Sequence, residues 1–131
     1  MYHEIYQMPD ETAYSPARLE EARFLLDTPM DALFEKIGKE QRQRGSPQDL
    51  IAAGKLRFAA ITDKCRNGIC KNPQVRLLCR DRSADHVTHL VCAISDTILH
   101  TIGFPVPATT VAVIIVQSGI ESFCVSHWRE S

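Results

Sequence analysis

The longest unbroken apolar run of the chain, residues 111–116, lies inside a segment that stays mainly apolar over residues 109–124. Its Val and Ile residues suit a buried strand, because β-branched side chains pack well on a pleated surface. Apolar residues also recur at helical spacing beyond the run, at Ala112, Val116, Ile120 and Phe123. This second pattern favours a helix. We therefore expect a helix here, with a strand over residues 109–116 in an α+β fold as the alternative.

A helix of this composition has almost no polar side. It therefore needs other helices or a second chain around it, and we expect it to be the core element of the fold. It does not read as a membrane span, because Gln117 and Glu121 interrupt a run far shorter than the roughly 20 apolar residues that a bilayer requires.

A repeated local pattern marks four helix starts, each with a capping residue directly before a proline: Ser15-Pro16, Thr28-Pro29, Ser46-Pro47 and Asn72-Pro73. The capping side chain accepts a hydrogen bond from a backbone N–H of the first turn, and proline supplies the φ angle that starts a helix. The pattern predicts helices over residues 16–26, 29–44, 47–65 and 73–80. Gly45 ends the second, and a turn at Asn67-Gly68 follows the third.

A further helix is predicted from a cap at Ser83 to Ile102, because apolar residues repeat along one side of it: Val87, Leu90, Val91, Ile94, Ile98 and Ile102. The opposite side collects polar residues and is expected to face water: His86, His89, Asp96 and His100. Together these elements predict an all-α protein, a compact bundle of five to six helices with a hydrophobic C-terminal core helix. Residues 1–14 are expected to form a loosely packed arm, and residues 15–131 a single helical domain.

Charge is divided unevenly along the chain, although the net charge is only −1. Residues 36–82 hold twelve bases and four acids, while residues 1–35 hold two bases and eight acids. One interpretation is that the acidic first helix packs beside the basic second and third helices and neutralises them. The other is that the basic segment binds an acidic partner, either a protein or a nucleic acid.

The candidate partner-binding or nucleic-acid-binding residues are Lys39, Arg42, Arg44, Lys55, Arg57, Lys64 and Arg66. The two helices over residues 29–44 and 47–65 could form a helix-turn-helix. The start of the second helix, however, carries Gln48 and Asp49 rather than a set of base-reading side chains. A nucleic acid is therefore the alternative partner rather than the favoured one.

Cysteine and histidine gather between residues 65 and 92, and five of these residues are the candidate metal ligands: Cys65, Cys70, Cys79, His86 and His89. Their spacing argues against zinc, because no Cys-x-x-Cys pair is present. Cys65 and Cys79 also fall on apolar helix faces, where a cysteine behaves as a small buried hydrophobe. A metal-binding protein is thus the second alternative. An odd number of cysteines, with no secretory pattern at the N-terminus, predicts reduced thiols and a cytoplasmic location.

No catalytic motif is recognisable in the chain. Cys124 and His127 lie one turn apart, but a core cysteine and a surface histidine explain them more simply. We expect no enzyme activity and no cofactor. The function expected is that of a small cytosolic protein–protein interaction module, accessory to a larger effector, with an unknown protein partner. A homodimer through the last helix is also expected, and no membrane contact.

Overall fold

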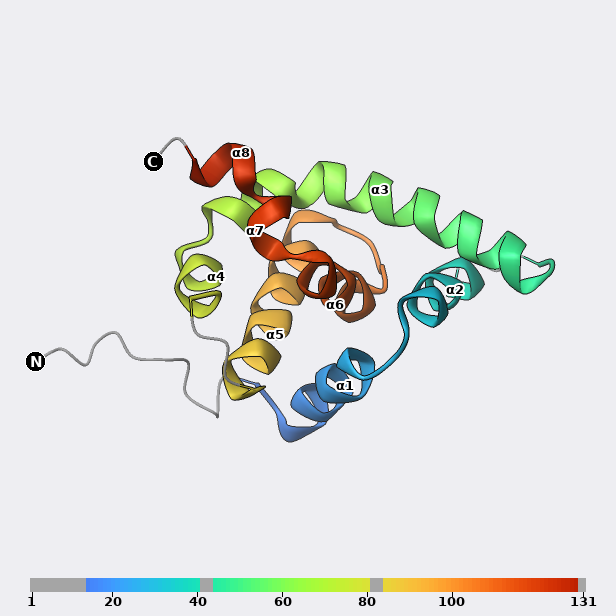
Figure 1. Cartoon of the computed structure of the whole chain (residues 1–131), viewed down its shortest axis with the longest axis horizontal. Coiled ribbons are helices and arrows are strands. Elements are labelled where there is room, and N and C mark those ends of the chain that lie inside the picture. Colours follow the sequence, from blue (N-terminus) through green and yellow to red (C-terminus); the bar gives the residue numbers. More distant parts are fainter. Residues whose placement is uncertain (1–13, 41–43, 81–83, 130–131) are drawn as a thin grey trace, which may run out of the picture.

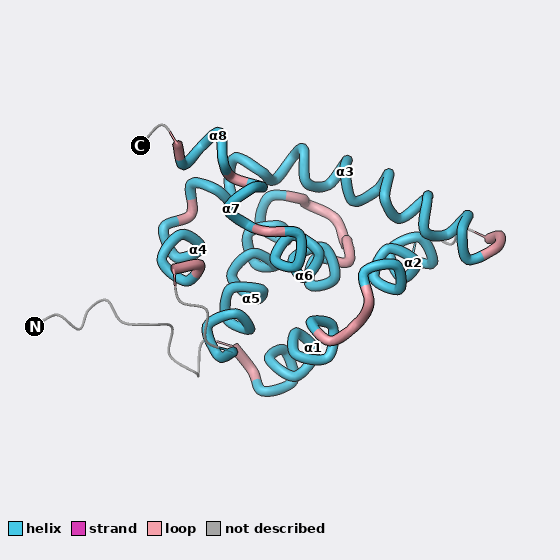
Figure 2. The backbone as a smooth tube through the Cα atoms, viewed as in Figure 1, coloured by secondary structure: helices cyan, strands magenta, loops and turns pink. Residues whose placement is uncertain are grey.

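The structure of the chain is a computed structural model that describes residues 14–40, 44–80 and 84–129. For residues 84 and 85 it describes the backbone alone. Every regular element in these ranges is a helix (Figures 1 and 2). The helices are α1 (Pro16–Leu26), α2 (Met30–Glu40), α3 (Pro47–Lys71), α4 (Pro73–Leu78), α5 (Ala84–Thr101), α6 (Ala108–Ser118), α7 (Ile120–Phe123) and α8 (Val125–Trp128). The all-α prediction is confirmed, and the strand over residues 109–116 is wrong.

The most apolar helix, α6, is also the most deeply buried. Each residue of the range 111–115 is at most 1% exposed. α5 packs along α6, while α1 and α2 cover it from other sides, so α6 sits near the centre of the molecule (Figure 1). A helix without a polar side is stable only in such a position. The prediction that this segment is the core element is confirmed.

The predicted last helix is divided into three. Gly119 has a φ of 109°, a left-handed conformation that side-chain-bearing residues rarely adopt. α6 therefore stops at Ser118, and the chain continues as two single-turn helices, α7 and α8. A continuous helix to Cys124 is wrong, because periodicity alone does not register the break at this glycine.

The predicted caps are present at three of the four starts. Ser15 Oγ accepts from the Arg18 amide at 3.2 Å, Ser46 forms a reciprocal capping box with Asp49, and Asn72 Oδ1 accepts from the Gln74 amide at 2.8 Å. Thr28 is different, because its hydroxyl donates instead to the carbonyl of Phe24 at the end of α1. α2 then begins at Met30, one residue later than predicted.

α3 is longer than predicted, and it runs straight through Asn67-Gly68 to Lys71. A glycine inside a helix costs about 1 kcal/mol relative to alanine. Burial of Ile69 and Cys70 beyond it, at no more than 3% exposure, favours the extra turn. The turn predicted at this dipeptide is therefore wrong. At the other end, the predicted extension of α2 over residues 41–43 lies outside the described residues, and Arg44 is not helical.

α2 and α3 form the closest pair of helices in the fold, and two glycines permit this contact. A Cβ atom at Gly54 would overlap the carbonyl oxygen of Phe34, and one at Gly38 would overlap that of Leu50. Phe34 also meets Phe58 edge to face, with ring centroids 5.6 Å apart. The side of α3 that carries Gly54 is thus held directly against the α2 backbone.

A disulfide bond joins Cys70, in the last turn of α3, to Cys124, between α7 and α8. The expectation of five reduced thiols is therefore wrong, although Cys65, Cys79 and Cys92 remain buried thiols outside the disulfide. The pairing is not visible in sequence because 54 residues separate the partners. Disulfides persist mainly in oxidising compartments. The cytoplasmic location, which rested on the N-terminal sequence as well as on reduced thiols, stays a prediction.

The predicted N-terminal arm lies outside the described residues except for Tyr14, which is 8% exposed and belongs to the core. Within the described ranges, no helix has both the length and the apolar character needed to cross a bilayer.

Candidate functional site

The side of α3 that faces away from α2 carries a strip of exposed small apolar residues around Leu56. Leu56 follows Gly54 by two residues, which places it about 200° around the helix from the α2 contact. Its exposure is 75%. Its neighbours one turn before and after, Ala52, Ala59 and Ala60, are exposed as well. We call these four residues the α3 strip, and Figure 1 shows α3 along one edge of the molecule.

Positive charge borders the α3 strip. Lys55 and Arg57 flank Leu56 in the sequence and therefore project to opposite sides of it, and exposed Lys64 lies one turn beyond Ala60. Residues 50–62 contain no acid. This surface combines an apolar centre with a basic border, a combination found at protein interfaces.

The acids that bound the strip are engaged within α3. Asp49 accepts from the Ser46 amide in the capping box at 3.2 Å. Asp63 lies 3.6 Å from Arg66 in an ion pair. Neither carboxylate therefore neutralises the bases beside Leu56.

The remaining predicted basic residues are placed elsewhere. Arg66 turns toward α7, where its Nε donates to the Phe123 carbonyl at 3.2 Å and its guanidinium carbon lies 4.3 Å from the Phe123 ring centroid. Lys39 pairs with Glu35 inside α2 at 3.6 Å. Arg44 is exposed in the segment before α3. Arg42 lies outside the described residues.

The acidic first helix does not lie along α3. α1 packs against α5 and α6 instead. Its interhelical ion pair joins Arg18 to Asp96 of α5 at 2.8 Å. The interpretation that α1 packs beside the basic third helix is therefore wrong, whereas its neutralisation of the second helix stays a prediction. Because α1 follows the core formed by α5 and α6, its acids are directed to a different part of the surface.

α1 carries another exposed apolar residue, Phe24, which is surrounded by acids. Sequence reasoning missed this residue. Phe24 is 72% exposed. Glu20, Glu21 and Asp27 lie three or four residues from it and thus on the same side of the helix, and all three are exposed. The signal was available in the sequence, since Phe24 falls off the apolar face formed by Leu19, Ala22 and Leu25.

The candidate metal ligands do not assemble into a site. Cys70 is committed to the disulfide, Cys65 and Cys79 are buried core residues, and His86 and His89 belong to α5. Among the described residues, no three His, Cys, Asp or Glu side chains come close enough together to hold an ion. Burial raises the pKa of the Cys65 thiol, as expected for a cysteine that serves as a core residue.

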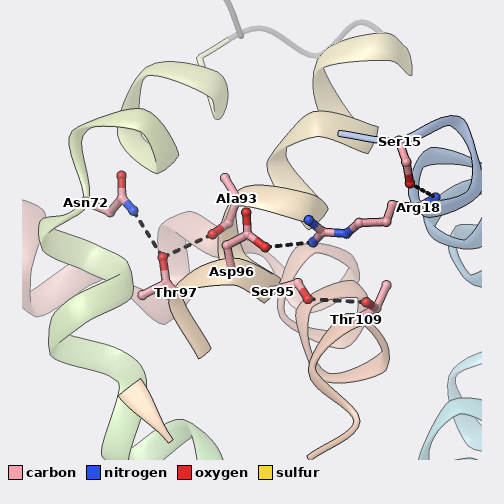
Figure 3. Close-up of polar contacts among 8 residues, drawn as sticks. All are labelled: Ser15, Arg18, Asn72, Ala93, Ser95, Asp96, Thr97 and Thr109. Carbon is pink, nitrogen blue, oxygen red and sulfur yellow. Dashed lines mark hydrogen bonds and ion pairs between the residues drawn. The ribbon is translucent and has the colours of Figure 1, made fainter. Parts of the chain in front are cut away.

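The polar side of α5 is only partly in contact with water, contrary to the prediction. His89 is 9% exposed, because Tyr14 packs on it with ring centroids 5.7 Å apart. The Arg18 guanidinium carbon in turn lies 5.2 Å from the Tyr14 ring centroid, and Arg18 bonds to Asp96 (Figure 3). Burial, followed by the charge of Asp96, raises the pKa of Tyr14.

Further hydrogen bonds attach other helices to α5. Asn72, at the start of α4, donates to Thr97 Oγ1 at 3.0 Å, and that hydroxyl donates to the carbonyl of Ala93 at 3.0 Å. Ser95 and Thr109 share a hydrogen bond of 3.2 Å between α5 and α6 (Figure 3). These contacts hold α1, α4 and α6 on α5. The polar side chains of α5 that make them therefore serve the packing of the helices.

The thiols of the described chain are poorly suited to nucleophilic catalysis. Burial raises the pKa of Cys92, and the charge of Arg18 lowers it by less. Cys124, which the sequence placed one turn from His127, is in the disulfide and cannot act as a thiolate in this state.

No known protein-family model, curated protein or solved structure matches this chain.

Proposed function

We propose that the protein is a non-catalytic protein–protein interaction module that associates with a second copy of itself, with α1 of one copy docked on the α3 strip of the other. The observation that carries the proposal is Leu56, 75% exposed at the centre of an alanine strip with a basic border. An exposed leucine alone is ordinary on a protein surface. Its continuity with three exposed alanines and its flanking charge of one sign are what favour an interface.

Charge complementarity indicates the occupant. Three acids surround Phe24 on α1, whereas bases flank Leu56 on α3. Two α3 strips placed face to face would oppose like charges, and so would two copies of α1. Pairing α1 with α3 instead brings an acidic border against a basic one and buries both Phe24 and Leu56.

The lengths of the two elements are compatible. The strip from Ala52 to Ala60 extends about 12 Å along α3, and the eleven residues of α1 extend about 16 Å. Alanine side chains also allow the axes of two packed helices to approach closely. If two copies make both contacts with each other, they form a closed dimer. If each copy instead gives α1 to one neighbour and its α3 strip to another, the copies form an open polymer.

The proposed contact differs from the homodimer expected through the last helix. Residues 111–115 of α6 offer no apolar surface to a second chain, because they are buried within their own fold. The two most exposed of the large apolar side chains, Leu56 at 75% and Phe24 at 72%, are on α3 and α1 instead.

A nucleic acid remains the alternative partner, since Lys55, Arg57 and Lys64 could meet phosphates. Phosphate recognition needs only the basic side chains, and it leaves the exposed Leu56 without a role. Stacking on nucleobases needs exposed aromatic rings, whereas Phe58 on α3 packs against Phe34. These observations favour a protein.

Analytical ultracentrifugation tests the proposal with single and mixed variants. We expect the wild-type chain to associate between about 10 µM and about 1 mM, and Leu56→Glu and Phe24→Lys each to sediment as monomers at these concentrations. An equimolar mixture of the two variants should regain association, because one variant keeps an intact α3 strip and the other an intact α1. Leu99→Glu, at an exposed leucine outside both surfaces, is the matched control and should associate as the wild type does.

Two results would overturn the proposal. The first is a wild-type chain that stays monomeric over the whole concentration range. The second is a mixture of the two variants that associates no more than either alone. If the monomer instead binds duplex DNA with an affinity that falls steeply as salt is added, the nucleic-acid alternative replaces it.

A further inference from the structure

A cavity of ≈ 710 Å³ lies where the end of α3, the start of α4 and α8 meet. Its volume falls within the range of small-molecule sites, which is about 300 to 1,000 Å³. The lining residues come from two segments far apart in the sequence: Cys70, Lys71, Asn72, Pro73, Arg76, Ser126, His127 and Trp128. We call this cavity the α3–α8 groove.

Two bonds hold the walls of the groove together. The disulfide ties Cys70 to Cys124, the residue directly before α8. Trp128 Nε1 then donates to the carbonyl oxygen of Cys70 at 2.8 Å. Because both bonds converge on the last turn of α3, the groove is formed before any ligand arrives. Such preorganisation reduces the entropic cost of binding.

The groove is basic. Lys71 and Arg76 are cationic, His127 adds a ring nitrogen, and none of the described residues that line the groove is acidic. The guanidinium carbon of Arg76 lies 5.4 Å from the ring centroid of Trp128. A guanidinium presents a planar set of donors that matches phosphate oxygens, and an indole offers a flat surface on which a planar ring can stack.

We infer that the α3–α8 groove binds a small organic phosphate with a planar ring, a nucleoside monophosphate being the simplest member of this class. The phosphate would take donors from Arg76 and Lys71, while the planar ring would lie against Trp128. This site is independent of the proposed association, because the groove begins at Cys70, about four helical turns along α3 from Leu56, and shares no residue with the α3 strip.

The chain contains one tryptophan, and it lines the groove, so tryptophan emission reports directly on occupancy. We expect AMP to change the emission saturably and to release or absorb heat with the same midpoint in titration calorimetry. Inorganic phosphate should bind more weakly, because it lacks the ring. Adenosine should also bind more weakly, because it lacks the charge.

Two arginine variants make the test specific to the groove. Arg76→Gln should weaken AMP binding about tenfold or more, as expected for the loss of a charge-assisted hydrogen bond. Arg23→Gln, on the exposed side of α1, is the matched control and should bind AMP as the wild type does. Circular dichroism verifies that both variants are folded, and Arg76→Gln should sediment as the wild type does.

The inference fails if neither emission nor calorimetry saturates with AMP up to about 10 mM, a concentration beyond any specific site of useful affinity. It fails equally if Arg76→Gln retains wild-type affinity. Inorganic phosphate binding as tightly as AMP would overturn the stacking role of Trp128. Loss of self-association in Leu56→Glu with AMP binding intact would support the separation of the two sites.

Discussion

α6 and α3 are both helices with a strong apolar pattern, yet they relate to the molecule differently. α6 has eleven residues, and its central five are buried on every side. α3 has twenty-five residues and buries a single stripe that includes Gly54, Ile61 and Cys65, while Leu56 remains 75% exposed. One helix is enclosed by the chain, and the other has a side that the chain does not cover.

The difference shows what an apolar residue means in each pattern. In α6 the apolar residues have no preferred side, so the segment must be enclosed regardless of register. In α3 the period of 3.6 residues separates the sides, and Leu56 falls opposite Gly54. A large apolar residue off the buried stripe of a regular helix is therefore informative about a partner, whereas one inside an all-apolar segment reports only on the core.

The largest predicted effect concerns the bond that fastens the end of α3. Reducing Cys70–Cys124 opens a loop closed over 54 residues. It should lower the free energy of unfolding by about 4 kcal/mol, since the unfolded chain loses a constraint. Urea denaturation with and without dithiothreitol measures the change. The double variant Cys70→Ser/Cys124→Ser is the control, because the reductant should leave its stability unaltered.

Truncation inside α6 should cost nearly as much. Ile114→Ala removes a side chain that is 0% exposed, and we expect a loss of about 3 kcal/mol from lost burial and the cavity left behind. Leu56→Ala removes a side chain of equal volume from α3 and should change stability by less than about 0.5 kcal/mol. Equal losses in urea denaturation would show that the two helices do not differ as described.

A smaller loss is expected where α3 does meet a partner helix. Gly54→Ala places a methyl group against the Phe34 carbonyl, so α2 and α3 must separate. We expect a cost of about 2 kcal/mol, typical of overpacking. Gly103→Ala is the control, because a Cβ there meets nothing within 4 Å. A tolerated Gly54→Ala, seen as an unchanged thermal midpoint, would contradict the close approach.

The smallest effect should appear at alkaline pH. Burial raises the pKa values of Cys65 and Cys92 in the folded state. Their unfolded counterparts ionise first as the pH rises. Stability is therefore full below the ordinary thiol pKa and declines above it. The urea midpoint should fall between about pH 8 and about pH 10, and it should fall less in Cys65→Ala/Cys92→Ala. An identical decline in that variant would assign the effect elsewhere, for example to Tyr14, whose pKa is also raised.

Much of the fold could be predicted from local patterns. The Ser15, Ser46 and Asn72 caps located the starts of α1, α3 and α4, because a cap and a following proline act within one turn. The burial of α6 followed from its composition. The turn predicted at Asn67-Gly68 is wrong, because the free energy gained by burying Ile69 in an extended α3 exceeds the local preference of this dipeptide for a turn.

The candidate site was only partly predictable, because it depends on contacts between distant segments. Lys55, Arg57 and Lys64 were identified by charge, and the helical period places Leu56 among them, but only the structure shows that Leu56 stays 75% exposed. The groove was missed altogether. Trp128 meets Cys70 only after Gly119 turns the chain, and no local pattern encodes that return.

The disulfide also divides the molecule mechanically. The segment between Cys70 and Cys124 forms a covalent ring that contains α4, α5, α6 and α7, whereas α1, α2 and nearly all of α3 lie outside it. A force applied to the two chain ends can therefore extend only the outer segments. Under tension the oxidised protein would release about 190 Å less chain than the reduced protein, at about 3.5 Å for each of the 54 residues shielded. The central helix α6 would stay inside a loop that pulling cannot open.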